Sequence, residues 1–220
     1  SSNTSGYGGG AISTSGTVDA IDSEFSGNDA ATDSGGAITA NGGTSTRSTF
    51  TDNSAGLSGG GVYFTGPTTI TDSTFSGNTA GNFGGGATIY GLASISGSTF
   101  SSNTAQVAGG GVYYASNTDV LAVSATTIAD NTVTNGNGGG MQVESGVHLV
   151  NSTITGNRAS GTSGAIHAYS WYDPQYPQYA TQPYNITLDF VTVSGNGAAI
   201  AGNFGTSSPQ VVTLIANASV

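Results

Sequence analysis

The sequence is organised around the stretch Phe75-Ser76-Gly77-Asn78, which is followed seven residues later by Gly85-Gly86-Ala87-Thr88. The first motif, Phe-x-x-Asn, recurs every 25 residues at Phe25 to Asn28, Phe50 to Asn53, Phe75 to Asn78 and Phe100 to Asn103. It continues with an aliphatic residue in place of Phe at Ile128 to Asn131, Ile154 to Asn157, Val193 to Asn196 and Leu214 to Asn217. Eight copies in a constant order indicate a repeat protein.

A pair of glycines followed by a small or β-branched residue lies between successive copies of this motif. It occurs at Gly9-Gly10-Ala11-Ile12, Gly35-Gly36-Ala37-Ile38, Gly60-Gly61-Val62-Tyr63, Gly85-Gly86-Ala87-Thr88 and Gly110-Gly111-Val112-Tyr113, and in degraded form near residues 139, 164 and 197. Glycine permits positive φ and close approach of two backbone segments. We therefore expect the pair at a bend into the next strand.

The residues within each repeat predict β-structure. Another apolar residue lies five positions before the Phe position in most copies, as in Ile70, Ile95, Val123, Leu149 and Leu188. No segment has a helical period, and each of the 37 glycines would cost a helix about 1 kcal/mol relative to Ala. A repeat of about 25 residues with three short strands has the size of one coil of a parallel β-helix. We predict one all-β domain, residues 1–220, of about eight coils.

The Phe and Asn positions are predicted to form two columns along this solenoid. Stacking of coils would bury one column made of Phe25, Phe50, Phe75, Phe100, Ile128, Ile154, Val193 and Leu214. Side-chain amides would stack as a ladder made of Asn28, Asn53, Asn78, Asn103, Asn131, Asn157, Asn196 and Asn217. We expect both columns to build the fold rather than to bind or catalyse.

The charge balance excludes several classes of protein. The chain has no lysine, two arginines and twelve acidic residues, for a net charge of -10. A nucleic-acid binder needs a basic patch, and so does a protein that binds membranes through polybasic segments. No apolar run approaches the roughly 18 residues of a membrane-spanning helix. Cysteine is absent, which removes thiolate metal sites, and we expect no metal and no cofactor.

The alternation of Gly-Gly-Ala-Ile and Phe-x-x-Asn motifs resembles the repeats of the chlamydial polymorphic outer-membrane proteins and of related bacterial and archaeal surface proteins. The resemblance extends from Asn3 to Asn217. It implies a right-handed parallel β-helix passenger that is extracellular or displayed on the cell surface and is often structural or adhesive. Those proteins usually contain cysteine, which this chain lacks. The resemblance therefore supports fold and location better than any particular partner.

Both ends of the chain lie in the phase of the repeat. Ser1-Ser2-Asn3-Thr4 matches Ser101-Ser102-Asn103-Thr104. Solenoids normally carry polar caps because exposed coil ends are unpaired strand edges, and no cap is visible here. Two interpretations follow. Residues 1–12 of one copy stack on residues 205–220 of another, which builds a head-to-tail filament, or the chain is a stalk segment of a longer autotransporter-like adhesin.

One repeat carries about 14 extra residues, between Tyr169 and Tyr184. Its three prolines exclude a central strand, so we predict a loop that projects from the rod. Tyr and Trp are favoured at recognition surfaces. Candidate contacts with glycans or other cell-surface proteins are Trp171, Tyr172, Tyr176, Tyr179 and Tyr184; a loop folded back over the sheet is the alternative. Sequons that permit glycosylation lie at Asn3, Asn151, Asn185 and Asn217.

Two other functions remain open. A polysaccharide-cleaving β-helix enzyme would need a basic group and clustered carboxylates, whereas this chain offers only Arg47, Arg158, His148 and His167 and singly placed Asp residues. This is the least favoured alternative, and we expect no enzymatic activity. An ice-binding β-solenoid would use a regular Thr and Ser array. The residues flanking the Phe column supply one, with Thr49/Thr51, Thr74/Ser76, Thr99/Ser101, Thr127/Ala129, Thr153/Thr155 and Thr192/Ser194.

Overall fold

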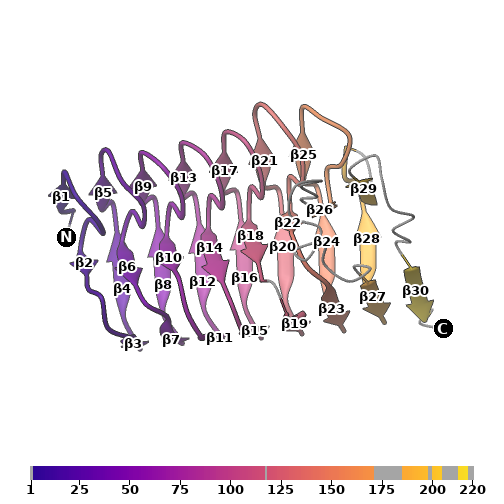
Figure 1. Cartoon of the computed structure of the whole chain (residues 1–220), viewed down its shortest axis with the longest axis horizontal. Helices are drawn as coiled ribbons and strands as arrows, with labels where there is room; N and C mark the ends of the chain where they lie inside the picture. The colour runs from indigo at the N-terminus through magenta and orange to yellow at the C-terminus, as the bar shows by residue number, and fades with distance from the viewer. Residues whose placement is uncertain (1, 117, 171–184, 198–199, 205–212, 218–220) are drawn as a thin grey trace, which may run out of the picture.

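The computed structural model of the chain describes residues 2–116, 118–170, 185–197, 200–204 and 213–217. Within these residues thirty short strands wind into a parallel β-helix, and each complete coil adds one strand to each of four sheets (Figure 1). Partner residues in neighbouring coils are commonly 25 positions apart, as in Thr49, Thr74 and Thr99. The predicted all-β parallel β-helix is confirmed, with about seven turns rather than eight, because two sheets contain seven strands.

Each coil has four strands, not the predicted three, because the segment after each ladder asparagine forms a strand of its own. This sheet, sheet A, consists of two-residue strands: β1 (Thr4–Ser5), β5 (Asp29–Ala30), β9 (Ser54–Ala55), β13 (Thr79–Ala80), β17 (Thr104–Ala105), β21 (Thr132–Val133) and β25 (Arg158–Ala159). Sheet B follows the glycine motif: β2 (Ile12–Ser13), β6 (Ile38–Ala40), β10 (Val62–Phe64), β14 (Ala87–Tyr90), β18 (Val112–Ala115), β22 (Met141–Val143), β26 (Ile166–Ser170) and β29 (Ile200–Phe204).

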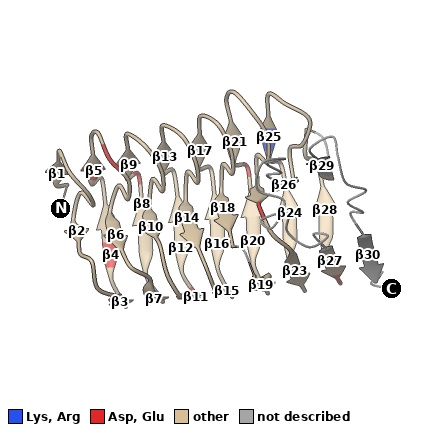
Figure 2. Ribbon diagram, viewed as in Figure 1, with Lys and Arg blue, Asp and Glu red and all other residues tan. Residues whose placement is uncertain are grey.

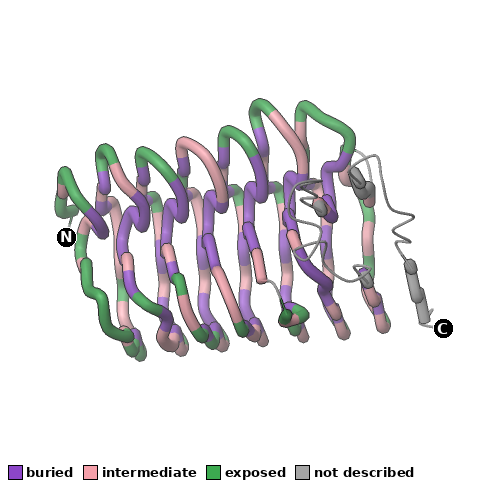
Figure 3. The backbone as a smooth tube through the Cα atoms, viewed as in Figure 1, coloured by how far each residue is buried: buried purple, intermediate pink, exposed green. Residues whose placement is uncertain are grey.

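The other two sheets follow in each coil. Sheet C contains β3 (Val18–Ile21), β7 (Gly43–Thr46), β11 (Thr68–Thr71), β15 (Ala93–Ser96), β19 (Leu121–Ser124), β23 (Val147–Val150), β27 (Asn185–Asp189) and β30 (Thr213–Asn217). Sheet D carries the Phe position: β4 (Glu24–Ser26), β8 (Thr49–Thr51), β12 (Thr74–Ser76), β16 (Thr99–Ser101), β20 (Thr127–Ala129), β24 (Thr153–Thr155) and β28 (Thr192–Ser194). Buried residues line the inside of the tube, and exposed residues gather at the corners and the first coil (Figure 3).

Two corners of the coil are made by residues with positive φ. Between sheets C and D, Asp22, Arg47 and Asp72 have φ of 48°, 48° and 50°. Between sheets D and A, Asp52 and Gly77 have φ of 54° and 66°. This left-handed conformation costs most side chains about 1–2 kcal/mol and is tolerated best by Gly, Asn and Asp. Asp22 and Asp72 therefore occupy equivalent turns two coils apart.

The glycine pair makes the close backbone approach expected of it, but in most coils the positive φ belongs to the glycine just before the pair. Gly59 has a φ of 69° at the bend before β10. Gly86 has no positive φ but lies against its neighbours: a Cβ added to it would approach the Gly111 carbonyl oxygen to 2.7 Å and the Phe100 ring to 3.0 Å. A side chain at Gly86 would therefore crowd Gly111 and Phe100, although the equivalent position in two other coils holds Ala37 and Ala165.

The Phe position forms a stacked column inside sheet D. The rings of Phe25, Phe50, Phe75 and Phe100 follow one another at centroid distances of 4.9, 4.5 and 4.7 Å, with interplanar angles of 5–6°. Phe50, Phe75 and Phe100 are fully buried. The strand register continues the column with Ile128, Ile154 and Val193.

The asparagines form a continuous hydrogen-bonded ladder beside this column. In each step one Asn Nδ2 donates to the Oδ1 of the Asn in the next coil, at 2.8–3.0 Å, through Asn3, Asn28, Asn53, Asn78, Asn103, Asn131, Asn157 and Asn196. The same Oδ1 also accepts the backbone N–H of the preceding ladder residue, as Asn78 Oδ1 does from Asn53 at 3.0 Å. From Asn53 onward, Nδ2 also donates to the carbonyl of the previous coil's Phe position, as Asn78 does to Phe50 at 2.9 Å.

The last predicted members of both columns are wrong in register. Leu214 pairs with Ile186, and Asn217 pairs with Asp189, so both lie in β30 of sheet C rather than in sheet D and the ladder. The segment Leu214 to Asn217 reproduces the Phe-x-x-Asn spacing by chance within a single strand. In contrast, Asn3, which was not among the predicted ladder residues although its surroundings match those of Asn103, is the first member of the ladder.

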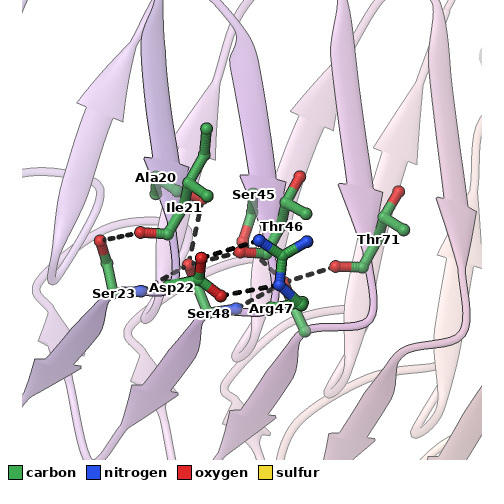
Figure 4. Close-up of polar contacts among 10 residues, drawn as sticks. Ala20, Ile21, Asp22, Ser23, Ser45, Thr46, Arg47, Ser48 and Thr71 are labelled. Atoms are coloured by element: carbon green, nitrogen blue, oxygen red, sulfur yellow. Dashed lines mark hydrogen bonds and ion pairs between the residues drawn. The ribbon is translucent and has the colours of Figure 1, made fainter.

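A second polar ladder runs along the corner between sheets C and D, and neither repeat motif predicted it. The backbone N–H groups of Ser23, Ser48 and Ser73 donate to the side-chain oxygens of the residues one coil ahead, each at 3.1 Å. The accepting hydroxyls turn back to a carbonyl two residues earlier, as Ser48 Oγ does to Thr46 at 3.0 Å (Figure 4). The ladder continues through Ser98, Thr126 and Ser152. It satisfies backbone groups that the corner would otherwise leave unpaired.

Replacing Asn78 by Ala should destabilise the rod strongly. The change removes the acceptor of Asn53 and the donor to the Phe50 carbonyl, all in a buried environment. An unsatisfied buried polar group costs about 1–3 kcal/mol, so we expect a loss of about 3 kcal/mol in the free energy of unfolding, measured by urea denaturation. The control is Asn135→Ala, at an exposed asparagine. Equal effects of the two changes would contradict a structural role for the ladder.

Candidate functional site

The outer face of sheet B carries large side chains at positions where other coils carry small ones. Residues of its strands alternate, so that Val62 and Phe64 are buried in the core while Tyr63 between them faces outward. The strand register places the outward residues in one column: Ser13, Thr39, Tyr63, Thr88, Tyr113, Gln142 and His167. Bulky groups thus replace Ser and Thr toward the later coils.

Aromatic contacts join these residues into one patch. The Tyr90 ring lies edge-on to Tyr63 at 5.8 Å and to Tyr113 at 6.1 Å between centroids. Phe83, from the segment between sheets A and B, stacks on Tyr113 at 4.8 Å. We call this set, with its polar members, the sheet B patch: Tyr63, Phe83, Tyr90, Tyr113, Glu144, His167 and Tyr169.

A carboxylate lies within the sheet B patch. The Tyr113 hydroxyl donates to Glu144 Oε1 at 2.5 Å. Burial raises the pKa of Glu144, and the hydrogen bond from Tyr113 acts in the opposite direction. Burial, followed by the proximity of Glu144, also raises the pKa of Tyr113. Burial raises the pKa of Tyr90 to about 12, with Tyr63 and Glu144 contributing.

His167 is the buried polar member of the sheet B patch. Its side chain is outside the core cluster but only 2% exposed, and its Nδ1 has no hydrogen-bond partner among the described residues. Burial lowers its pKa, so the imidazole is neutral at pH 7. The ring lies beside Tyr169, at 6.4 Å between centroids.

The sequence alone did not reveal this site. His167 directly follows a degraded glycine motif and Tyr113 ends an intact one, whereas Glu144, 31 residues after Tyr113, lies outside both motifs. A signal was available: Tyr, Gln and His at the outward position of the glycine-motif strand, where earlier coils have Thr39 and Thr88. Recognising this signal requires knowing which residues of successive coils pair. Motif spacing gives that pairing only while the repeat stays at 25 residues.

The other basic groups are not brought together. Arg47 forms two 2.7 Å hydrogen bonds to Asp22 at the corner between sheets C and D (Figure 4). His148 Nε2 lies 2.7 Å from Asp189 Oδ2 on sheet C, and Arg158 is exposed on sheet A. Charged residues are sparse and dispersed along the rod (Figure 2). In the described part of the chain, no three His, Asp or Glu side chains are placed to hold a metal ion.

The hydroxyl columns on sheet D lie in register, as drawn from the sequence. Thr49, Thr74, Thr99, Thr127, Thr153 and Thr192 follow one another strand by strand. The second column is tied in places by hydroxyl contacts, such as Thr51 to Ser76 at 3.4 Å. It is interrupted by Ala129, and Glu24 replaces Thr in the first coil. The face is therefore regular over part of its length.

A shallow groove of about 560 Å³ crosses the outer face of sheet C. It combines apolar side chains, among them Leu92 and Val120, which are 60% and 52% exposed, with the hydroxyls of Thr44, Thr69 and Ser94. The groove provides a second surface on which a partner could rest, on a different sheet from the sheet B patch.

The predicted contact residues Trp171, Tyr172, Tyr176, Tyr179 and Tyr184 lie outside the described residues. Among the sequons, Asn151 is exposed at a corner with a φ of 49°. Asn3 Nδ2, the atom that would carry a glycan, donates to Asn28 Oδ1. Asn185 begins β27 and Asn217 ends β30.

These coils define the class of the protein as a parallel β-solenoid. The family model described as a right-handed β-helix region matches residues 8–177, and the chain belongs to that family. No curated protein and no solved structure matches the chain. The family description confirms the right-handed β-helix and names a fold rather than an activity. Within the described residues no helix has the length and apolar character needed to cross a membrane.

Tyr90 should make the rod more sensitive to alkali. Its folded-state pKa of about 12 lies above the ordinary value of about 10, so the folded chain holds this proton more tightly than the unfolded chain. The associated stability is present below pH 10 and is lost as pH rises toward 12. Urea unfolding between pH 9 and 12 should show a shallower loss of stability for Tyr90→Phe than for the wild type, by up to about one proton per molecule.

The matched control for this experiment is Tyr7→Phe, at a tyrosine that is 88% exposed. If both substitutions change the pH slope equally, the environment of Tyr90 is not the cause.

Proposed function

We propose that this protein is a non-enzymatic structural and adhesive element, extracellular or on the cell surface, whose rod presents the sheet B patch to a partner. The observation that carries this proposal is the joined aromatic cluster around Tyr63, Tyr90 and Tyr113, on a rod whose other described faces display mainly Ser and Thr. Tyr63 and Tyr90 are partly exposed, and Tyr113 is buried beside them. Partly exposed aromatic side chains supply binding energy at low entropic cost.

The interior supports the structural half of the proposal. The Asn ladder, the Ser ladder and the Phe column run through successive coils with constant hydrogen-bond and ring distances. A rod of constant cross-section suits a spacer or stalk. The resemblance to polymorphic outer-membrane proteins supports the same role, including that of a stalk segment in a longer adhesin.

Loss of the exposed rings should weaken adhesion. We expect Tyr63→Ser combined with Tyr90→Ser to reduce retention of the labelled chain, on intact cells of the producing strain and on immobilised polysaccharides, by about tenfold. Two aromatic contacts at an interface commonly contribute about 1–2 kcal/mol in total. The control is Leu92→Ser in the groove on sheet C. Retention lost with Leu92→Ser and unchanged with the tyrosine variant would assign adhesion to the groove instead.

We also propose that copies stack head to tail, through residues 1–12 of one and 205–220 of the next. Residues 213–217 form β30, and the rest of the second segment lies outside the described residues. The support comes from the first coil, where β1, β2, β3 and β4 each have a hydrogen-bonded neighbour on one side only. Phe25 is likewise stacked on one face, by Phe50. Such edges accept a coil of the same chain or of another copy.

Blocking one edge should prevent such stacking. The Val18 N–H donates to the Gly42 carbonyl of the next coil. Because N–H directions alternate along a parallel strand, the next N–H, that of Asp19, faces the free edge of the first coil. Electron microscopy of concentrated protein should show filaments with an axial repeat of about 35 Å, from about 4.8 Å per coil, for the wild type and Asp19→Ala. Asp19→Pro, which lacks that N–H, should give short rods. Short rods from the wild type would contradict the proposal.

A further inference from the structure

The surroundings of Glu144 are set by the register of three coils. Tyr90 pairs with Ala115. The pairs Tyr114 with Val143 and Val143 with Ala168 place Glu144, one residue further on, between Ala115 and Tyr169. The backbone N–H of Glu144 donates to the Tyr114 carbonyl at 2.8 Å, which holds this register beyond the end of β22. The second outward column of sheet B therefore reads Tyr90, Ala115, Glu144, Tyr169.

This column places aromatic rings on both sides of a carboxylate. Coils are about 4.8 Å apart, so Tyr169 is one step from Glu144 and Tyr90 is two steps away on the other side. Ala115, between Tyr90 and Glu144, contributes only a methyl group. Tyr113, two residues before Ala115 on β18, reaches across to Glu144 Oε1 at 2.5 Å.

No described cation neutralises this carboxylate. The chain has no lysine, Arg47 is paired with Asp22, and His148 is paired with Asp189. Arg158 lies on sheet A, and the neighbouring His167 is held neutral by burial. A partly buried carboxylate without a counter-charge is unfavourable, so a cation bound here would relieve an existing cost.

We propose that Glu144, held by the hydroxyl of the buried Tyr113 and flanked by the rings of Tyr90 and Tyr169, forms a receptor site for a quaternary ammonium group carried by the partner of the sheet B patch. Aromatic faces attract organic cations through their quadrupole, and quaternary ammonium groups are favoured ligands of aromatic cages. A primary ammonium would need three acceptors in exchange for water, whereas Glu144 is the only carboxylate in the sheet B patch. A quaternary ammonium group has no N–H and therefore needs no acceptor.

This inference rests on the proposed adhesive role for its biological context and names the chemistry of the partner. The test uses the full chain, titrated with choline and followed by tyrosine fluorescence and by chemical shifts of the aromatic protons. Choline should bind with a dissociation constant on the order of 1 mM. Its neutral isostere 3,3-dimethylbutan-1-ol and the primary amine ethanolamine should each bind at least tenfold more weakly.

The variants separate charge from shape. Glu144→Gln should weaken choline binding about tenfold and leave binding of the neutral isostere unchanged, while Tyr90→Leu should weaken binding of both. The chain has one other glutamate, Glu24, on sheet D, and Glu24→Gln is therefore the matched control, with no expected change. Circular dichroism and urea unfolding of each variant establish that it is folded.

Three results would overturn the inference: equal affinity for choline and its neutral isostere, equal or tighter binding of ethanolamine, or choline binding unaffected by Glu144→Gln. Failure of the inference is distinguishable from failure of the proposed function. Adhesion that depends on Tyr63 and Tyr90 but is not inhibited by choline leaves the adhesive role standing and removes the cation. Choline binding by the wild type, together with adhesion unchanged in the Tyr63→Ser, Tyr90→Ser variant, would leave the cation site standing and remove the adhesive role of the sheet B patch.

Discussion

The rest of the structure depends on the hydrogen bond between asparagine side chains in neighbouring coils. A carboxamide offers a donor and an acceptor on opposite sides, so each ladder residue satisfies one coil behind and one coil ahead, as Asn78 does between Asn53 and Asn103. Both bonds form only if every coil places its asparagine at the same height. The register fixed in this way also aligns the Phe rings and the serine ladder, because a shift of one residue would turn every side chain to the opposite face.

The sequence predicted the parts of the fold that recur from coil to coil, namely the apolar position of Phe75 and the ladder position of Asn78. It was wrong where spacing could be imitated: Leu214 and Asn217 copy the motif inside a single strand of sheet C. It also underestimated the strands per coil, because two-residue strands such as β13 leave no periodic pattern. The sheet B patch was not predicted from the sequence, for a related reason. Tyr113 and Glu144 are neighbours only through coil register, and neither motif contains Glu144.

The division between inward and outward positions explains how such a uniform fold can carry a specific site. Inward side chains have the same structural role in every coil, because each packs against the coils on either side. Outward side chains on sheet B are not needed for packing between coils. The same register position holds Thr39, Tyr63, Tyr113 and His167 in different coils. Recognition can therefore change in one coil while the scaffold stays constant, which fits the general separation of site from fold.

The asparagine ladder also gives the rod an electrical direction. From Asn3 to Asn157 each Nδ2 donates one N–H to the Oδ1 of the next C-terminal coil, so each accepting Oδ1, up to that of Asn196, faces the N-terminal side. The amide dipoles therefore add along the axis, and each polarises the next. The coil at Asn3 is the negative pole of this array and the coil at Asn196 its positive pole. Two such rods laid end to end attract one another in one relative orientation and repel in the other.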